Sequence, residues 1–220
     1  MANEITGNPW NEFSKTRKCL YTVGADRPGF HGDLQLIEIV ENCIANGTKI
    51  FIETGAYHGC TSYYVAANFD LLCYSCELIE DNFNIAKINT QQFSNLNLFH
   101  NNSLDFLKDL IKNNPNFKNQ KTIFWLDAHG DQRNSGPILQ EIEFIKTQFT
   151  DYIIFVDDVN TPNSKTNEQF DLEYLSKIYD AYDTYYIPTY TEKTGYSLTG
   201  WIMISSEDLG ILPHCEKFDF

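Results

Sequence analysis

The chain has 220 residues, which is enough for one α/β domain with a full hydrophobic core and too few for two ordinary domains. Hydrophobic residues make up 42% of it and aromatic residues 15%, so a chain that is disordered throughout is excluded. The formal net charge is −14 and no basic patch with interleaved aromatic residues is visible, which argues against a nucleic-acid partner. An acidic protein suits a cationic or neutral small ligand or a divalent metal, although solubility alone also explains the charge.

No targeting or membrane-spanning segment is visible in the sequence. The first residues lack a basic segment followed by an apolar core, and no apolar stretch approaches the roughly 20 residues that cross a bilayer. We therefore expect a cytoplasmic protein with no membrane contact. Among six cysteines, Cys73 and Cys76 form a C-x-x-C, but residues three apart on a strand point to opposite faces. Reduced core thiols are therefore favoured over a metal site.

Two regions of the chain differ in character. Residues 1–32 are polar and irregular, and we expect them to form an N-terminal arm or lid, with a single α/β domain over 33–220. Within this domain the spacing of apolar residues predicts a helix from Leu34 that ends at Asn46-Gly47. After it, strands predicted at about 49–54, 71–77, 96–101, 122–127 and 151–157 alternate with helices predicted at about 60–68, 81–93, 103–113, 137–148 and 169–180. This alternation predicts a doubly wound parallel sheet with right-handed crossovers.

The C-terminal part of the domain has a different pattern. Strands are predicted over 183–190 and 197–205, and Glu192-Lys-Thr-Gly195 between them looks like a hairpin turn. Pro188 places the first of these strands near a sheet edge, because proline cannot donate a backbone hydrogen bond. We therefore expect the parallel sheet to end in an antiparallel hairpin.

The predicted first, fourth and fifth strands end in acidic residues. Glu53 closes the first strand, Asp127 the fourth and the Asp157-Asp158 pair the fifth. Buried parallel strands read as unbroken apolar runs, and open α/β sheets bind ligands just beyond the carboxyl ends of their strands. We therefore expect these carboxylates to form one acidic site at the rim of the sheet, although each of them could instead cap a helix or lie in a loop.

The turns after the first three strands carry residues suited to a nucleoside. Gly55 and Gly59 follow the first strand and would let the backbone approach a ligand, although a tight turn without a ligand is the alternative. Glu77 ends the second strand, 24 residues after Glu53, where a carboxylate can accept both hydroxyls of a ribose. After the third strand, Asn101-Asn102-Ser103 could reach an adenine edge, or its serine could cap the next helix.

This order of features resembles the class I S-adenosylmethionine-dependent methyltransferases over about residues 34–206. In that family a seven-stranded, mostly parallel, Rossmann-like sheet ends in an antiparallel hairpin. The first acidic-glycine turn faces the methionine part of the cofactor, an acidic residue after the second strand holds the ribose, and the loop after the third contacts adenine. The resemblance implies cofactor contacts by Glu53, Thr54, Gly55, Tyr57, Gly59, Ser62, Glu77, Asn102, Ser103 and Asp127. One departure is Tyr57, which replaces a glycine that many members have in the first turn.

A narrower resemblance is to the magnesium-dependent, macrocin-type sugar O-methyltransferases. In that group a carboxylate after strand four and an Asp-Asp pair after strand five hold the metal, which implies Mg²⁺ (or Mn²⁺) ligands at Asp127, Asp157 and Asp158. A second carboxylate, two residues after the first, acts as the base there. His129 occupies this position here, with Asp131 as the reserve base, and the Leu-Tyr-Glu-Ser-Thr segment that usually follows is absent.

The donor chemistry is consistent with this resemblance. Magnesium takes hard oxygen ligands and keeps several waters, so three carboxylates leave positions for a substrate diol. Coordination would lower the pKa of a substrate hydroxyl, and a histidine could then take its proton. We therefore expect an S-adenosylmethionine-dependent O-methyltransferase for a small polar acceptor such as a sugar or glycoside. The arm 1–32 and the loop 160–168 would close over that acceptor.

Several alternatives remain open at this point. The same carboxylates could serve a metal-dependent hydrolase that uses no sulfonium cofactor, or the nucleoside site could belong to a non-catalytic binding module. His129 could be a base, a metal ligand or a hydrogen-bonding loop residue. Either a monomer or a homo-oligomer fits the sequence.

Overall fold

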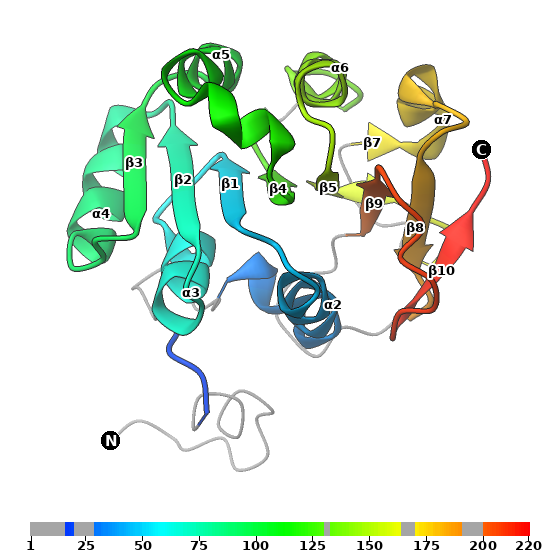
Figure 1. Cartoon of the computed structure of the whole chain (residues 1–220), viewed down its shortest axis with the longest axis horizontal. Helices are drawn as coiled ribbons and strands as arrows, with labels where there is room; N and C mark the ends of the chain where they lie inside the picture. Colours follow the sequence, from blue (N-terminus) through cyan, green and yellow to red (C-terminus); the bar gives the residue numbers. More distant parts are fainter. Residues whose placement is uncertain (1–15, 20–28, 130–132, 164–169, 191–199) are drawn as a thin grey trace.

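The computed structural model describes residues 16–19, 29–129, 133–163, 170–190 and 200–220. An eight-stranded sheet in the order β10-β8-β9-β5-β4-β1-β2-β3 forms its centre (Figure 1). The strands are β1 (Ile50–Thr54), β2 (Leu72–Glu77), β3 (Leu96–His100), β4 (Thr122–Leu126), β5 (Tyr152–Asp157), β8 (Thr184–Pro188), β9 (Trp201–Ser205) and β10 (Cys215–Phe218). Strands β1 to β5 pair in parallel, whereas β9, β8 and β10 pair antiparallel. The predicted mostly parallel, Rossmann-like sheet with an antiparallel C-terminal end is confirmed.

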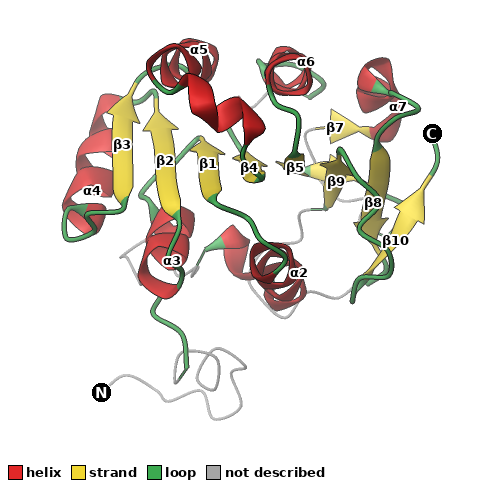
Figure 2. Ribbon diagram, viewed as in Figure 1, coloured by secondary structure: helices red, strands yellow, loops and turns green. Residues whose placement is uncertain are grey.

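Helices cover both faces of this sheet. Figure 2 shows α2 and α3 on one face and α5 and α6 on the other, which gives three layers. The α-helices are α2 (Leu34–Ala45), α3 (Cys60–Asn68), α4 (Glu80–Thr90), α5 (Ser103–Asn113), α6 (Ile138–Gln148) and α7 (Leu172–Leu175), with short 3-10 helices η1 (Phe30–Gly32), η2 (Pro115–Asn119) and η3 (Ser176–Ile178). None of the helices in the described ranges is long and apolar enough to span a membrane.

The parallel strands read as unbroken apolar runs because both of their faces are buried. In β4, Phe124 and Leu126 belong to the apolar cluster that includes α5 and α6. Ile123 and Trp125 alternate with them and belong to the cluster that includes α2 and α3. These four apolar side chains of the strand therefore lie in one of two cores, and only the residues beyond its carboxyl end are left to serve a site.

The structure corrects the prediction near residues 169–180, where a full helix was expected. Phe170–Asp171 instead forms the short strand β7, which pairs in parallel with β6 (Val159–Asn160), and α7 has only four residues. The 3-10 helix η3 continues the chain to Ile178, and the helical conformation ends at Tyr179, whose ψ is 134°. Beyond it, the Asp180 N–H donates to the Tyr185 hydroxyl at 2.7 Å instead of continuing a helix.

The sheet also has one strand more than the predicted seven. β10 (Cys215–Phe218) lies at the edge and pairs antiparallel with β8. Its four residues carry no alternating apolar pattern, so only the pairing with β8 specifies the strand. β8 and β9 pair as the predicted hairpin strands, and the expected turn at 192–195 lies outside the described residues.

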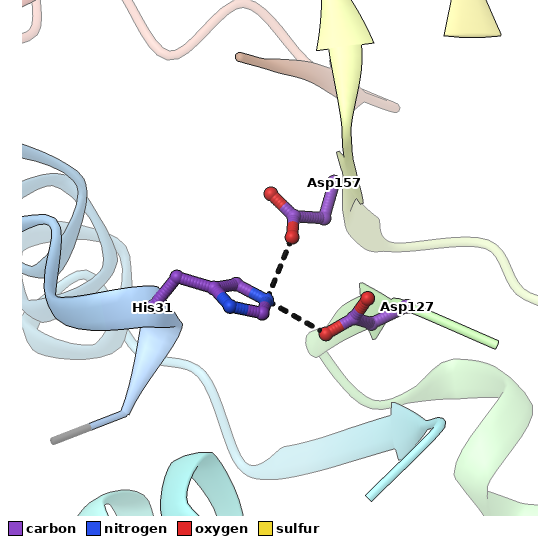
Figure 3. Close-up of side chains that lie close together, drawn as sticks. All are labelled: His31, Asp127 and Asp157. Carbon is purple, nitrogen blue, oxygen red and sulfur yellow. Dashed lines mark hydrogen bonds and ion pairs between the residues drawn. The ribbon is translucent and has the colours of Figure 1, made fainter. Parts of the chain in front are cut away.

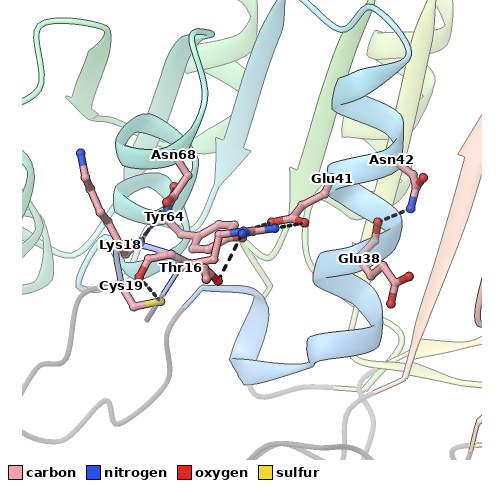
Figure 4. Close-up of polar contacts among 9 residues, drawn as sticks. Thr16, Lys18, Cys19, Glu38, Glu41, Asn42, Tyr64 and Asn68 are labelled. Carbon is pink, nitrogen blue, oxygen red and sulfur yellow. Dashed lines mark hydrogen bonds and ion pairs between the residues drawn. The ribbon is translucent and has the colours of Figure 1, made fainter. Parts of the chain in front are cut away.

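The described part of the N-terminal segment is tied to two helices of the domain (Figure 4). Arg17 makes a two-pronged ion pair with Glu41 of α2, with N···O distances of 2.6 and 2.9 Å. The Tyr64 hydroxyl of α3 donates to the same carboxylate at 2.5 Å. Asn68 exchanges two hydrogen bonds with the backbone of Lys18. These contacts fix residues 16–19 across α2 and α3. Residues 1–15 and 20–28 of the predicted arm lie outside the described ranges.

All six cysteines are free thiols, as the sequence indicated. Cys73 and Cys76 are both buried in β2. Burial raises the pKa of Cys73 to about 12, so this thiol stays protonated and behaves as a small apolar side chain.

The turn between β1 and α3 lies directly against the end of β4. Gly55 has a φ of +81°, a left-handed conformation that favours glycine. A Cβ atom at this position would lie 2.4 Å from the backbone oxygen of Asp127 and 2.6 Å from its carbonyl carbon. Because both contacts are with backbone, no side-chain rotation could relieve them. Gly55 is therefore required for the first turn to reach the fourth strand.

We expect Gly55→Ala to lower the free energy of unfolding by at least about 2 kcal/mol, because backbone strain and overlap with Asp127 add together. Gly47→Ala is the matched control: φ there is +99°, but nothing lies within 4 Å of the added Cβ. Only the backbone cost of about 1 kcal/mol should remain. Urea denaturation measures both losses, and equal values would contradict the close approach of Gly55 to β4.

Candidate active site at the carboxyl edge of the sheet

The register of β1, β4 and β5 brings the predicted carboxylates together. Thr54 pairs with Leu126, and Leu126 with Val156, so the strands end at the same level. The Asp127 N–H still donates to the Thr54 carbonyl at 3.0 Å, which holds Asp127 at the edge of the sheet. Asp157 is the last residue of β5 and follows Val156 directly. The two aspartates therefore lie side by side, as the sequence predicted.

A histidine that the sequence analysis left unassigned lies between these two aspartates (Figure 3). His31 Nε2 is 2.9 Å from Asp127 Oδ2 and 2.8 Å from Asp157 Oδ2. His31 belongs to η1, and its side chain is 28% exposed. One feature of the sequence could have indicated this segment. Phe30 and His31, an apolar residue followed by an imidazole, stand between two glycines in a stretch that otherwise looks irregular.

Phe30 anchors the histidine. Its ring is fully buried and meets the Trp125 ring edge-on, with the centroids 5.1 Å apart. Its N–H donates to the Thr61 hydroxyl of α3 at 2.9 Å. Aromatic packing and this hydrogen bond therefore hold η1 against β4 and α3, so the part of the predicted arm nearest the site is packed into the core.

The predicted base, His129, pairs with the second aspartate of the pair after β5. His129 Nε2 lies 2.7 Å from Asp158 Oδ2 and 3.8 Å from Asp127 Oδ1. Its side chain is 6% exposed, and its ring meets the Phe170 ring edge-on at 5.0 Å. A carboxylate beside an imidazole both orients the ring and stabilises its protonated form. Asp131, the reserve base, lies outside the described residues.

Burial and neighbouring charges shift the pKa values of the histidines and aspartates in this cluster. Burial lowers the pKa of His31, but the charges of Asp157 and Asp127 outweigh it, so that the pKa lies well above its usual value. The pKa of His129 is also raised, because its hydrogen bond to Asp158 and the nearby carboxylates outweigh burial. Burial raises the pKa of Asp127. The neighbouring carboxylates thus favour the protonated form of both histidines.

A cavity of about 650 Å³ opens beside Asp127 and reaches past the end of β2. This volume is in the range of small-molecule sites. Of the predicted residues, it is lined by Gly55, Tyr57, Glu77, Asn102, Ser103, Asp127 and His129. Leu78 and Ile79 add apolar side chains that are mostly exposed.

Glu77 and Asn102 organise the far end of this cavity. The Glu77 carboxylate accepts the backbone N–H groups of Tyr57 and Ile79, both at 2.8 Å. It therefore ties the turn after β1 to the turn after β2. Asn102 caps α5 by accepting the Asp105 N–H at 2.9 Å, so the helix cap that we considered for Ser103 belongs to Asn102.

Glu53 lines a second cavity of about 330 Å³, which shares Gly55, Tyr57, His31 and Asp127 with the first. The Glu53 carboxylate is almost fully buried and accepts hydrogen bonds from the hydroxyls of Ser62 and, at 2.5 Å, of Ser75. Burial raises the pKa of Glu53 to about 7. Without a ligand this carboxyl is therefore poised between its two protonation states near neutral pH.

Three predicted cofactor residues line neither cavity and instead pack or form hydrogen bonds beneath the site. Ser62 holds Glu53, as described above. Gly59 caps α3 with a φ of +79° and packs against α4, where its Cβ would meet Thr90 at 3.1 Å. Thr54 is buried within β1. Asp157 and Asp158 likewise line neither cavity, and they reach the site through their contacts with His31 and His129.

Sequence reasoning also missed a buried carboxyl group, that of Glu141, which lies next to Ser103. Glu141 of α6 is fully buried, and burial raises its pKa to about 7, although the hydroxyls of Ser103 and Thr54 act in the opposite direction. The periodicity of α6 contains the signal. Glu141 follows Ile138 by three residues and precedes Ile145 by four, so it belongs to the buried face of the helix.

No protein-family model and no curated protein matches the chain. Solved methyltransferase structures do share its architecture. An O-methyltransferase from Bacillus cereus in complex with SAH aligns with a TM-score of 0.55 at 17% identity, over 90% of this chain and 87% of that one. The chain has the Rossmann-like methyltransferase fold.

Two further structures of this fold support the assignment. A putative O-methyltransferase from Klebsiella pneumoniae aligns with a TM-score of 0.56 at 14% identity, over 92% of this chain and 91% of that one. TomG from Streptomyces achromogenes, an O-methyltransferase of tomaymycin synthesis in complex with SAM, aligns with a TM-score of 0.55 at 14% identity, over 78% of each chain. At these identities the similarity establishes the shared fold, and function has to be argued from the site.

The raised pKa of Glu53 predicts that stability falls with rising pH. The unfolded carboxyl loses its proton near pH 4.5, whereas the folded one keeps it until about pH 7, so the folded state is favoured below pH 4.5 and loses this contribution as pH rises through about 7. Glu53→Gln, which stays neutral, should reduce the loss of unfolding free energy between pH 5 and pH 8 by more than about 1 kcal/mol. Urea melts at both pH values measure it. The exposed Glu143→Gln is the control, and an equal pH dependence in wild type and Glu53→Gln would contradict the raised pKa.

Proposed function

We propose that this chain is an S-adenosylmethionine-dependent O-methyltransferase that uses a divalent cation. Its acceptor would be a hydroxyl of a small polar metabolite, with a sugar or glycoside as the best candidate. The observation that carries the proposal is the cavity between Glu77 and Asp127, which opens at the carboxyl edge of a Rossmann-like methyltransferase sheet and is lined by seven of the residues predicted from the sequence.

The two cavities together suit the parts of the proposed cofactor. Glu77 would accept the ribose hydroxyls, and Asn102 and Ser103 would lie toward the adenine, beside the apolar side chains of Leu78 and Ile79. Glu53, in the second cavity, would face the amino group of the methionine part. A cationic group there would favour the ionised form of this buried carboxyl. S-adenosylmethionine, when bound, supplies an electrophilic methyl group.

His129 would act as the general base. Its imidazole lines the cavity at Asp127, and Asp158 holds Nε2 at 2.7 Å. Nδ1 is buried and has no hydrogen-bond partner among the described residues. Asp158 would stabilise the imidazolium that forms when His129 takes a proton from the acceptor hydroxyl, as a carboxylate does beside a catalytic histidine. The remaining task of the chain is to orient the acceptor and exclude water.

The donor chemistry of the cluster fits a divalent cation. Ligand-type atoms of His31, Asp127 and Asp157 lie within 4.8 Å of one another, and so do those of Asp127, His129 and Asp158. Asp127, Asp157 and Asp158 would supply the carboxylates for Mg²⁺ or Mn²⁺, with Asp158 shared between the ion and His129. When bound, such an ion lowers the pKa of an acceptor hydroxyl.

Cofactor binding can be tested without knowing the acceptor. Titration calorimetry with S-adenosylhomocysteine should show binding to the wild type, and Glu77→Gln should weaken it by about tenfold, because a charged hydrogen bond contributes roughly 1.5–3 kcal/mol. The glutamine side chain has the same shape as glutamate, and its oxygen can still accept one of the two backbone N–H groups that Glu77 binds. Glu80→Gln, an exposed change three residues on, should bind as wild type does. Absence of heat with the wild type would favour the metal-dependent hydrolase instead.

The base assignment is tested with a panel of sugar acceptors, S-adenosylmethionine and a divalent ion. His129→Gln should lower methyl transfer by about 10²- to 10⁴-fold, the usual contribution of a general base, while S-adenosylhomocysteine still binds. His214→Ala, which removes a surface imidazole paired with Glu38, should change neither quantity. Full activity of His129→Gln would remove His129 from the chemistry.

A further inference from the structure

We propose that His31 is a ligand of the divalent ion, and that the site therefore prefers a first-row transition ion over magnesium. This inference rests on the proposed function, because it concerns the same ion. It adds a nitrogen ligand to a site whose other proposed ligands are all carboxylates. This nitrogen comes from a segment outside the three acidic strand ends.

The first argument is the convergence of three ligand atoms. His31 Nε2 faces Asp127 Oδ2 at 2.9 Å and Asp157 Oδ2 at 2.8 Å. An imidazole nitrogen carries a single hydrogen, which cannot point straight at two oxygens at once. A cation at the common point interacts with the nitrogen and both oxygens together. The arrangement in Figure 3 is thus that of three ligands directed at one place.

The second argument is that His31 is held in place on both sides. Phe30 before it is fully buried and bonded to Thr61. Asp33 after it caps α2 by accepting the Leu36 N–H at 3.1 Å, and its other oxygen accepts the Tyr190 hydroxyl at 2.6 Å. The backbone that carries the imidazole is therefore held in place on both sides. A metal ligand needs such a fixed position.

The third argument is backbone strain at this segment. Phe30 and His31 both have a φ of +51°, in the left-handed region that side chains with a Cβ avoid. Each such residue costs about 1–2 kcal/mol, which the surrounding contacts must offset. Strain of this kind collects at functional sites, where the position of a side chain matters more than local stability. Here it directs the imidazole at the two aspartates.

Ligand type then decides the ion. Magnesium demands oxygen ligands in a near-ideal octahedron and keeps much of its water. Imidazole suits first-row transition ions, whose affinities for nitrogen-containing sites rise from manganese through cobalt and nickel. One nitrogen and two carboxylate oxygens thus favour ions such as Mn²⁺, Co²⁺ or Zn²⁺. A purely structural ion pair of His31 with the aspartates is the alternative, and it predicts no such preference.

The test is metal binding by the full chain after treatment with a chelator, in the absence of any sulfonium cofactor. Calorimetric titrations with MnCl₂, CoCl₂ and MgCl₂ should give Mn²⁺ and Co²⁺ affinities at least about tenfold higher than that of Mg²⁺. His31→Ala should lower the Mn²⁺ affinity by about 10- to 100-fold and leave the Mg²⁺ affinity nearly unchanged. Pulsed electron paramagnetic resonance of the Mn²⁺ complex should show a nitrogen coupling that His31→Ala removes or reduces.

Controls separate loss of a ligand from loss of the fold. His31→Gln keeps a polar side chain of similar length, so it should remain folded by circular dichroism and still lose the nitrogen coupling. His214→Ala should bind Mn²⁺ as wild type does, because its imidazole lies on the surface beside Glu38. A nitrogen coupling that survives in both His31 variants, or equal wild-type affinities for Mn²⁺ and Mg²⁺, would overturn the inference.

The metal titrations and the tests of the proposed activity can fail separately. A wild type that binds Mn²⁺ through His31 but gives no heat with S-adenosylhomocysteine supports the ion site while refuting the methyltransferase. A wild type that binds S-adenosylhomocysteine and methylates an acceptor, yet shows the same metal affinities as His31→Ala, refutes the role of His31 and leaves the enzyme intact.

Discussion

The common register of β1, β4 and β5 is the constraint on which this site depends. Thr54, Leu126 and Val156 lie level across the three strands, so the residues that follow them meet at one edge. A slip by one residue would turn the apolar side chains of a strand, which alternate between two cores, to the opposite face. The approach of Asp127 to Asp157 is therefore enforced by core packing, and the rest of the chain has to accommodate two neighbouring carboxylates.

Two histidines pair with these carboxylates, and both come from outside the strands. His31 reaches Asp127 and Asp157 from the N-terminal side, and His129 reaches Asp158 from the loop after β4. Carboxylates grouped at a half-buried edge are costly unless cations offset them, because low dielectric strengthens repulsion as well as attraction. Asp158 also has a positive φ, of +56°, so backbone strain occurs on both sides of the cluster. Charge compensation and strain thus concentrate where the sheet opens, whereas the cores are apolar and regular.

The sequence predicted the elements whose signals are local. Unbroken apolar runs identified β1, β4 and β5, and the residues after them, among them Asp127 and Asp158, were found because parallel strands end together. His31 could not be placed in this way, since its position follows from the packing of Phe30 against Trp125, nearly a hundred residues away. The same reason explains β10, which exists only through pairing with β8, and the shortening of the helix expected at 169–180, where Phe170–Asp171 pairs with β6 as the strand β7. Glu141 differs, because the helical period of α6 already marked it as buried.

Asp127 joins the parts of the site to one another. It lines both cavities, its Oδ2 faces His31 and its Oδ1 lies toward His129. Its backbone oxygen also limits Gly55 to glycine. A substitution at Asp127 would therefore disturb the proposed cofactor contacts, the proposed ion site and the position of the proposed base together, so its effect could not be assigned to any one of them. His31, Glu77 and His129 come from three different parts of the chain: η1, the end of β2 and the loop after β4. Separate functions can be distinguished at these three residues, while the aspartate between them couples all three.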